Sequence, residues 1–379
     1  MKRMIIFLAA CLIGGTSVRA GGFEQPNQSA AAAGVANAFV ATADGASALG
    51  FNPSGIAWLS PGVHIEGGGY MDYRDSSVRL PNVVAPNEGI ETLAGSFFAV
   101  WVPASSRFSA GWGMAPLYQV TNNWEKAFPG AAGVSGTSGT VDITAHHATA
   151  DIVYAINSSL SMGLGADWYV TRVTMRQGTA PSFVGDDFAG FGGHVSMTWK
   201  PMPAWSVGLM ARSGASVNIS ANAGEKMAFK LPDQFSVGIA HDFADVWRLE
   251  TDVKWTRWSS LKDLNVTSGA AIVQLNQLDL RDTLNVMAGL TWTWRENSQF
   301  RVGYAYEQAA SRNTTFNPAL ADQDGHRISL GFGADLFDAH MDLAYQYVFY
   351  KNRTVTGPYA GTYRDRRQTL MLSGSKTFE

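Results

Sequence analysis

Polar and apolar residues alternate with a period of two along most of this chain. Within residues 246–255, Trp247, Leu249 and Trp255 fall on one face, whereas Arg248 and Glu250 fall on the other. Successive side chains of a β-strand point to opposite faces, so this alternation predicts strands with one apolar and one polar side.

About fourteen such segments follow one another from residue 62 onward, and turn-rich stretches separate them. Short and long connections alternate, which is typical of an up-and-down barrel with tight turns at one rim and long loops at the other. We therefore predict an all-β fold, a 14-stranded antiparallel transmembrane β-barrel over residues 61–379. The expected strands lie near residues 62–73, 91–103, 106–118, 141–156, 159–175, 187–199, 205–219, 227–242, 246–259, 279–294, 298–308, 325–336, 339–351 and 365–378.

A soluble sandwich with a buried apolar face would also use amphipathic strands. Three features favour the membrane barrel. Trp and Tyr gather near strand ends, as at Trp292, Trp294 and Tyr347, where interfacial girdles lie. Charged residues make up 16% of the chain, below the roughly 25% of a soluble domain. An even number of strands also allows a closed sheet without edges.

Residues 1–20 read as a secretory signal peptide. Lys2 and Arg3 precede an apolar stretch of about 12 residues, too short for a membrane helix of about 20, and small residues end the segment at Ala20. The mature chain is then expected to begin at Gly21, with lipidation at Cys11 as the alternative. Cys11 is the single cysteine, so a chain cleaved after Ala20 has no thiol or disulfide. These features suggest the bacterial outer membrane.

Residues 21–60 do not alternate, and they are rich in Ala and Gly. Stretches at 29–39 and 43–49 are compatible with helix. About forty residues of this kind can neither span lipid nor form a stable domain alone. We expect them to fold as a partly helical hatch that plugs the barrel.

Several motifs make a family resemblance specific. The box Asn52-Pro53-Ser54-Gly55 and the segment 33–39 resemble the N-terminal hatch of the FadL family of outer-membrane transporters, although the family's box is usually Asn-Pro-Ala. Leu231-Pro232-Asp233 and Trp255-Thr256-Arg257-Trp258 match further family segments. The resemblance covers nearly the whole mature chain.

The resemblance implies a plugged, fourteen-stranded barrel that captures long-chain fatty acids or other hydrophobic molecules at extracellular loops. It implies their transfer to a hatch pocket and lateral release into the membrane. An apolar solute gains about 0.8 kcal/mol per methylene on leaving water, so exit into lipid is favoured over exit into an aqueous periplasm. Such release requires an opening in the wall.

The third predicted strand is a candidate for that opening. Gly111 and Gly113 lack side chains at inward positions, and Pro116 cannot donate to a ladder, so the strand is a poor continuous one. A kink that opens the wall is the interpretation that we prefer, and family members are similar in placing one here. Glycines that ease barrel curvature are the alternative.

For the ligand, the resemblance implies an apolar contact at Phe23 and cationic partners for a carboxylate at Arg172 and Arg281. Arg281 has inward parity, whereas Arg172 falls on the lipid face unless a bulge shifts the register or it sits above the membrane. Charges on the lumen or rim without a ligand role are the alternative for both. Aromatic residues of the long loops offer a capturing groove: Trp124, Phe128, Phe183 and Phe188.

Other function classes find little support. The chain has no Gly-x-Ser-x-Gly elbow, and its histidines show no metal spacing, so we expect no enzyme, no metal and no cofactor. The formal charge of −3 without a basic block argues against nucleic acid. We expect a monomer that meets hydrophobic small molecules and membrane lipid. A general porin or a structural barrel is the alternative function.

Overall fold

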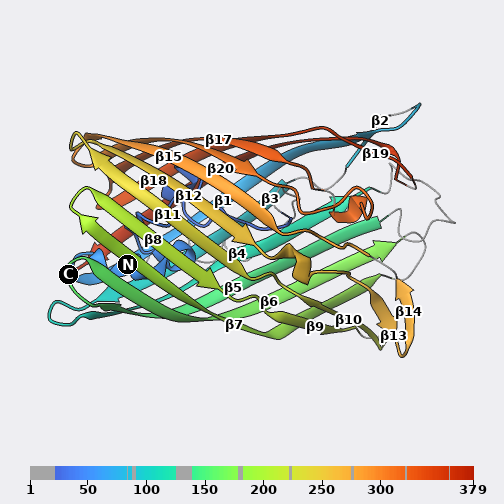
Figure 1. Cartoon of the computed structure of the whole chain (residues 1–379), viewed down its shortest axis with the longest axis horizontal. Helices are drawn as coiled ribbons and strands as arrows, with labels where there is room; N and C mark the ends of the chain where they lie inside the picture. Colours follow the sequence, from blue (N-terminus) through green and yellow to red (C-terminus); the bar gives the residue numbers. More distant parts are fainter. Residues whose placement is uncertain are drawn as a thin grey trace.

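A computed structural model of the chain describes residues 22–82, 84–87, 91–124, 139–177, 182–221, 224–274, 277–320, 322–357 and 359–379. The expected signal peptide, 1–20, and the expected first mature residue, Gly21, lie outside these ranges. The described residues form an elongated barrel of tilted strands (Figure 1).

The barrel wall is one closed antiparallel sheet. The main sheet has sixteen strands, of which two short ones, β2 and β19, flank the fourteen that make the wall. Pairing of β20 with β1 over residues 63–79 closes the circle, which confirms the predicted 14-stranded barrel. The wall strands are β1 (Gly62–Arg79), β3 (Glu91–Val102), β4 (Phe108–Asn123), β5 (Gly139–Ala155), β6 (Leu160–Gln177), β7 (Phe183–Met202), β8 (Trp205–Arg212), β11 (Gln234–Phe243), β12 (Trp247–Thr256), β15 (Thr283–Arg295), β16 (Ser298–Glu307), β17 (Gly325–Leu336), β18 (Ala339–Tyr350) and β20 (Gly361–Phe378).

The apolar side of the strands faces outward. In β6, Met162 and Leu164 are 51% and 67% exposed, whereas Asp167 on the opposite face is buried. A soluble sandwich would bury these apolar side chains, so that alternative is wrong. The outer surface instead has the apolar band that a lipid bilayer covers.

The two ends of the barrel differ. At one end the strands join through tight turns such as Ala244-Asp245 and Phe337-Asp338, whose positive φ angles of 52–61° fit two-residue hairpins. We name this the short-turn end and the opposite one the long-loop end. The short strands β2 (Val84–Pro86) and β19 (Arg353–Val355) extend beyond the long-loop end (Figure 1). Two short 3₁₀ helices, η3 (Trp258–Ser260) and η4 (Pro318–Leu320), belong to the connections of that end.

A second, four-stranded sheet also extends from the long-loop end. It consists of β9 (Ser216–Ser220), β10 (Glu225–Lys230), β13 (Val266–Ser268) and β14 (Ala271–Gln274). The sequence predicted single strands at 205–219 and 227–242, and the structure corrects both. Each divides into a wall strand and an outer strand, because Pro232 cannot donate to a ladder and Gly214 lies against the carbonyl of Leu231.

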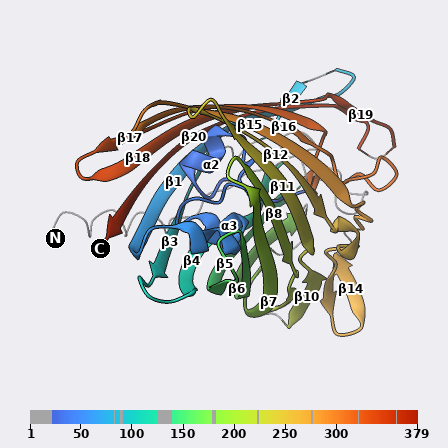
Figure 2. The ribbon, with the colours of Figure 1, turned by 60° about the vertical axis from the view of Figure 1, so that its left-hand side comes forward.

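Residues 22–59 lie inside the barrel, where Figure 2 shows α2 and α3 surrounded by strands. The segment contains α2 (Ala30–Gly34), α3 (Ala48–Phe51) and the 3₁₀ helix η2 (Pro53–Trp58). Glycines of the wall let this N-terminal segment approach the strands closely. A Cβ added at Gly208 would lie 2.0 Å from the Val40 carbonyl oxygen. Among the described residues, no helix is both long and apolar enough to cross a membrane.

Candidate functional site

The wall is interrupted between β3 and β4. Their ladder pairs Phe97–Trp101 with Ala110–Met114 and stops there within the described residues, although β3 stays paired with β1 as far as Glu91. Beyond Met114, β4 pairs with β5 alone in the main sheet, and a bulge at Leu117 shifts its register. From Ala115 to Asn122 both faces of β4 are buried, so this half of the strand bends into the lumen.

The three residues singled out on this strand lie on either side of the point where the ladder ends: Gly111 and Gly113 are still paired with β3, and Pro116 lies beyond the last pair. A Cβ added at Gly113 would lie 2.3 Å from the ring of Phe98, so the glycine lets that ring turn inward. A Cβ at Gly111 would lie 2.7 Å from Leu49 of the hatch. Pro116 lies two residues past the last β3–β4 pair and is the last residue that pairs with β5 before the bulge.

The N-terminal segment Phe23–Gln25 lies along the bent part of β4. Gln25 donates its backbone N–H to the Leu117 carbonyl at 2.7 Å, and Gln119 donates to the Phe23 carbonyl at 2.7 Å. The hatch therefore forms an isolated antiparallel bridge with the edge that β3 leaves unpaired.

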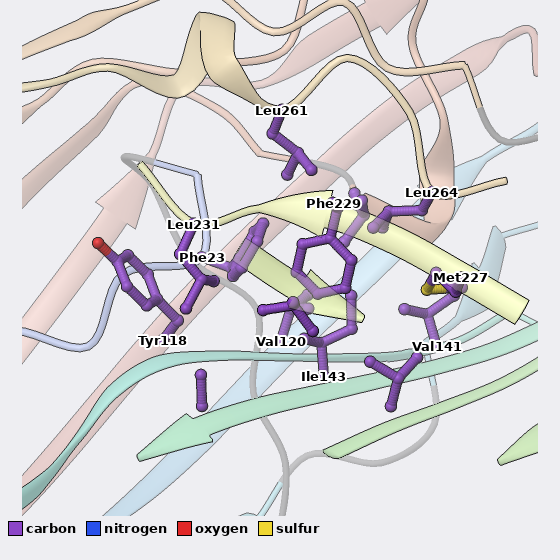
Figure 3. Close-up of a cluster of buried hydrophobic side chains, with 14 of the residues drawn as sticks. Phe23, Tyr118, Val120, Val141, Ile143, Met227, Phe229, Leu231, Leu261 and Leu264 are labelled. Carbon is purple, nitrogen blue, oxygen red and sulfur yellow. The ribbon is translucent and has the colours of Figure 1, made fainter. Parts of the chain in front are cut away.

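An apolar cluster surrounds Phe23 at the long-loop end of the lumen (Figure 3). The Phe23 ring lies 4.7 Å from that of Trp258 and 5.9 Å from that of Tyr118, measured between centroids. A small cavity adjoins the ring, and we name it the apolar cavity. It is lined by Gly22, Phe23, Val120, Leu280, Leu320 and Asp322.

One carboxyl group lies at this apolar cavity. Asp322, in the loop after β16, accepts the backbone N–H of Ser311 at 3.0 Å and lies 3.7 Å from the Arg353 guanidinium. Burial raises the pKa of the Asp322 carboxyl above its ordinary value despite these partners. The carboxyl group is thus held by the loop and is not an unmatched charge facing the cavity.

The Leu-Pro-Asp motif links the bend of β4 to the outer sheet. Leu231 is buried in the cluster, and Tyr118 donates its hydroxyl to the Pro232 carbonyl at 3.2 Å. Asp233 accepts the Gly214 N–H at 2.8 Å. Burial opposes ionisation, but this N–H and the Lys230 ammonium hold the pKa of Asp233 below its ordinary value. Through these contacts, the motif holds Leu231 in the apolar cluster at the side where the cluster meets the outer sheet.

The hatch box holds the hatch to the wall. Asn52 donates its side-chain amide to the Val40 carbonyl at 2.7 Å and to the Thr198 hydroxyl at 3.1 Å. The Ser54 hydroxyl donates to the Asn52 side-chain oxygen at 2.6 Å and lies 2.8 Å from the Thr198 hydroxyl. Ser54 stands where the family's box usually has Ala, and its hydroxyl adds hydrogen bonds to the contact between Asn52 and Thr198.

Three wall carboxylates that the sequence analysis did not single out hold the hatch backbone. Asp252 accepts the N–H groups of Phe39 and Val40 at 2.7 and 2.9 Å. Glu250 accepts those of Ala41 and Thr42 at 2.6 and 3.2 Å, and Glu66 accepts that of Ser47 at 2.9 Å. Alternation showed these residues on the polar face, but a sequence pattern does not give their partners in the hatch.

The two candidate arginines lie apart. Arg172 is 70% exposed on the outer face of β6, and its Nε lies 2.7 Å from Asp186 of β7, so the structure does not bring it to the lumen. Arg281 donates to the Ala309 carbonyl at 2.8 Å and follows Leu280, which lines the apolar cavity. Of the two, only Arg281 is adjacent in sequence to a residue that lines this cavity, and its guanidinium lies 4.0 Å from Asp324.

The three loop aromatics that the structure describes do not form the expected groove. Trp124 is buried and donates to the Pro318 carbonyl at 2.8 Å, and Phe183 is buried in the cluster around Phe23. Phe188 is 59% exposed on the barrel's outer face, and Phe128 lies outside the described residues. The three described side chains therefore pack against a loop, pack into the cluster or face outward.

A closed barrel with an apolar outer band and an internal plug defines a class of outer-membrane β-barrel. The family model described as outer membrane protein transport protein (OMPP1/FadL/TodX) matches residues 11–206 and 189–375. The chain belongs to this family, as the motifs predicted.

Individual relatives are distant in sequence but similar in fold. The chain is 23% identical over 354 residues to a long-chain fatty acid transport protein of Escherichia coli, with 78% of this chain and 76% of that protein covered. It superimposes on a Pseudomonas aeruginosa FadL homologue with a TM-score of 0.84, at 19% identity, over 94% of this chain and 100% of that one. The Pseudomonas putida toluene transporter TodX gives a TM-score of 0.66, at 17% identity, over 88% and 94%.

Proposed function

We propose that this protein takes up hydrophobic molecules across the bacterial outer membrane and releases them sideways into the membrane. The observation that carries the proposal is the end of the β3–β4 ladder at Phe97 and Met114, directly beside the apolar cluster around Phe23. An apolar molecule in that cluster has a route to lipid that crosses only the hatch segment Phe23–Gln25.

The route runs in three stages. The molecule passes from the long-loop end into the apolar cavity beside Phe23. Movement of Phe23–Gln25 away from Leu117 and Gln119 then uncovers the edge of β4, at a cost of two backbone hydrogen bonds. The molecule leaves between β3 and the bend of β4 into hydrocarbon, where burial stabilises it by about 0.8 kcal/mol per methylene.

The substrate class follows from the same site. The relatives include a protein named for long-chain fatty acids and one named for toluene, so we propose a fatty acid or a hydrocarbon. Phe23 supplies the apolar contact, and Arg281 is the proposed partner of a carboxylate near the cavity. Arg172, which pairs with Asp186 outside the barrel, has no place in this route.

Deleting Leu117 tests the lateral route. Leu117 is the extra residue of the bulge, and its removal lets the rest of β4 continue in the register that Pro116 shares with His146. We expect the deletion to abolish uptake of radiolabelled oleate and of toluene by cells, while the barrel still folds and inserts. Unchanged uptake by a folded deletion variant would refute the lateral exit.

The proposal extends to processing and assembly. We propose that residues 1–20 are removed on export and that residues 21–60 act as the hatch of a monomeric barrel over 61–379. N-terminal sequencing of protein from outer membranes should then start at Gly21. A steady, porin-like conductance of the intact protein in planar bilayers would favour the general porin instead.

A further inference from the structure

Exposed arginines mark the outer face of the seam where β20 closes the barrel on β1. On β20, Arg364 and Arg366 are exposed, whereas Asp365 between them is buried on the opposite face. On β1, Arg79 is exposed as well. All three lie in the halves of these paired strands that lead to the long-loop end (Figure 1). We name Arg79, Arg364 and Arg366 the seam arginines.

The register of the seam brings the three side chains together. Ser77 of β1 pairs with Arg364, and Asp75 pairs with Arg366, so Arg79 stands diagonally across the ladder from Arg364. Positions two apart on one face of a strand, and diagonal positions across a ladder, lie about 7 Å apart. Arginine side chains are long enough to cover this distance, so the three guanidinium groups can converge on one anionic head group.

The seam arginines differ from the inward-facing arginines of the same strands. Arg74 and Arg367 form ion pairs with Asp365 and Asp72 inside the lumen. The seam arginines form no ion pair with any residue that the structure describes, and this includes Asp75 beside them. Like charges that are crowded on one face repel one another. The seam therefore lacks an anion that its charges would attract.

The depth of the seam arginines in the membrane follows from the residues next to them. From Arg366 toward the short-turn end, the outer face of β20 continues with Gln368 and then with Leu370 and Leu372, which are 46% and 41% exposed. Tyr345 of β18 pairs with Leu370 and donates its hydroxyl to Gln368 at 2.8 Å. An outward arginine is costly at the bilayer centre but not at the interface. This order of apolar, aromatic and cationic side chains places the seam arginines at the level of the lipid head groups.

A phosphorylated glycolipid has the chemistry that fits this surface. Long loops of outer-membrane barrels face outward, so the seam arginines meet the outer leaflet. Guanidinium groups bind phosphate through two parallel hydrogen bonds. The acyl chains of such a lipid would lie over Leu370 and Leu372. A zwitterionic phospholipid carries a cation beside its phosphate, which a purely cationic surface disfavours.

We propose that Arg79, Arg364 and Arg366 bind the phosphate groups of a phosphorylated glycolipid of the outer leaflet. Its acyl chains pack on the apolar face of β20 next to them. β1 and β3 separate this surface from β4, so the lipid site does not depend on the proposed uptake route. Because the lipid neutralises charges on both strands of the seam, it stabilises the closure of the barrel.

Binding of diphosphoryl lipid A to the purified full-length mature barrel tests the site. Arg79→Gln, Arg364→Gln and Arg366→Gln are made singly and together, and binding is measured by native mass spectrometry in detergent. Thermal unfolding of each variant without lipid checks that it is folded. A charge-matched control removes three exposed cations elsewhere at the long-loop end: Lys226→Gln, Lys262→Gln and Arg312→Gln.

We expect each single variant to bind lipid A about fivefold more weakly and the triple variant about 100-fold more weakly, the scale of one surface cation facing an anionic lipid in each case. The control should bind as the wild type does. Monophosphoryl lipid A, with one phosphate fewer, should lose less affinity in the triple variant. Lipid A should raise the unfolding temperature of the wild type but not that of the triple variant. An excess of inorganic phosphate should not displace lipid A, because it lacks the acyl chains.

Other outcomes overturn the inference. Unchanged binding by the folded triple variant refutes the site. An equal loss in the control would show that net charge, rather than the seam, attracts the lipid. Displacement of lipid A by inorganic phosphate would show that the seam holds a free anion. Each of these results leaves the uptake proposal standing, because that proposal uses none of the seam arginines.

Discussion

The carboxylate of Asp252 is expected to keep the hatch docked. Replacing Asp252 with Ala removes the acceptor for the N–H groups of Phe39 and Val40, which it holds at 2.7 and 2.9 Å. All three residues are buried, so both N–H groups lose their partner without gaining water. Each unsatisfied group costs about 1–3 kcal/mol, which gives about 2–6 kcal/mol for the pair.

A loss of this size is large compared with the docking of a forty-residue plug. Each 1.4 kcal/mol changes a population about tenfold, so the undocked hatch should become about 30-fold to 20,000-fold more populated. The barrel itself is held by continuous ladders that do not use the Asp252 side chain. We therefore expect an intact wall around a hatch that opens from time to time.

Single-channel recording in planar bilayers measures this directly. The wild type should conduct little, whereas Asp252→Ala should show transient openings of large conductance. Asp75→Ala serves as the control, because it removes a carboxylate from the outer face of β1 and should behave as the wild type. If folded Asp252→Ala stays as closed as the wild type, the carboxylate does not dock the hatch.

Three further predictions concern single contacts. Ser54→Ala restores the family's usual box and should cost about 1–3 kcal/mol of stability through the lost hydrogen bond to Asn52, measured by thermal unfolding, with uptake retained. Arg281→Ala should lower cellular uptake of oleate and leave that of toluene unchanged, whereas equal losses would exclude a carboxylate role. Arg172→Ala should change neither, since an exposed ion pair contributes about 0–1 kcal/mol, and a selective loss of oleate uptake would contradict its placement outside the lumen.

The wall could be predicted from the sequence because lipid imposes a simple pattern on each strand. Alternation located the fourteen wall strands, and it correctly put Arg172 on the outer face of β6. The division of 227–242 into β10 and β11 was missed, although Pro232 was visible in the sequence. Tertiary contacts with the cluster, rather than local pattern, decide where that strand ends.

The candidate site was only partly predictable. Gly113 and Pro116 indicated a weak third strand, because a missing side chain and a missing N–H act locally. The covering of its edge by Phe23–Gln25 joins segments about ninety residues apart, which no local pattern encodes. The same holds for Asp252 and Glu250, whose inward parity was evident but whose partners are backbone groups of the hatch.

Photoaffinity labelling during uptake tests the lateral route most directly. A palmitate analogue with a diazirine at the end of its chain is supplied to cells, activated by light, and located on the protein by mass spectrometry. Sideways release predicts labels at Phe23, at Leu117 and along 92–96, the part of β3 without a β4 partner. Labels confined to 56–59, where η2 leads to the short-turn end, would show instead that the molecule passes through the hatch.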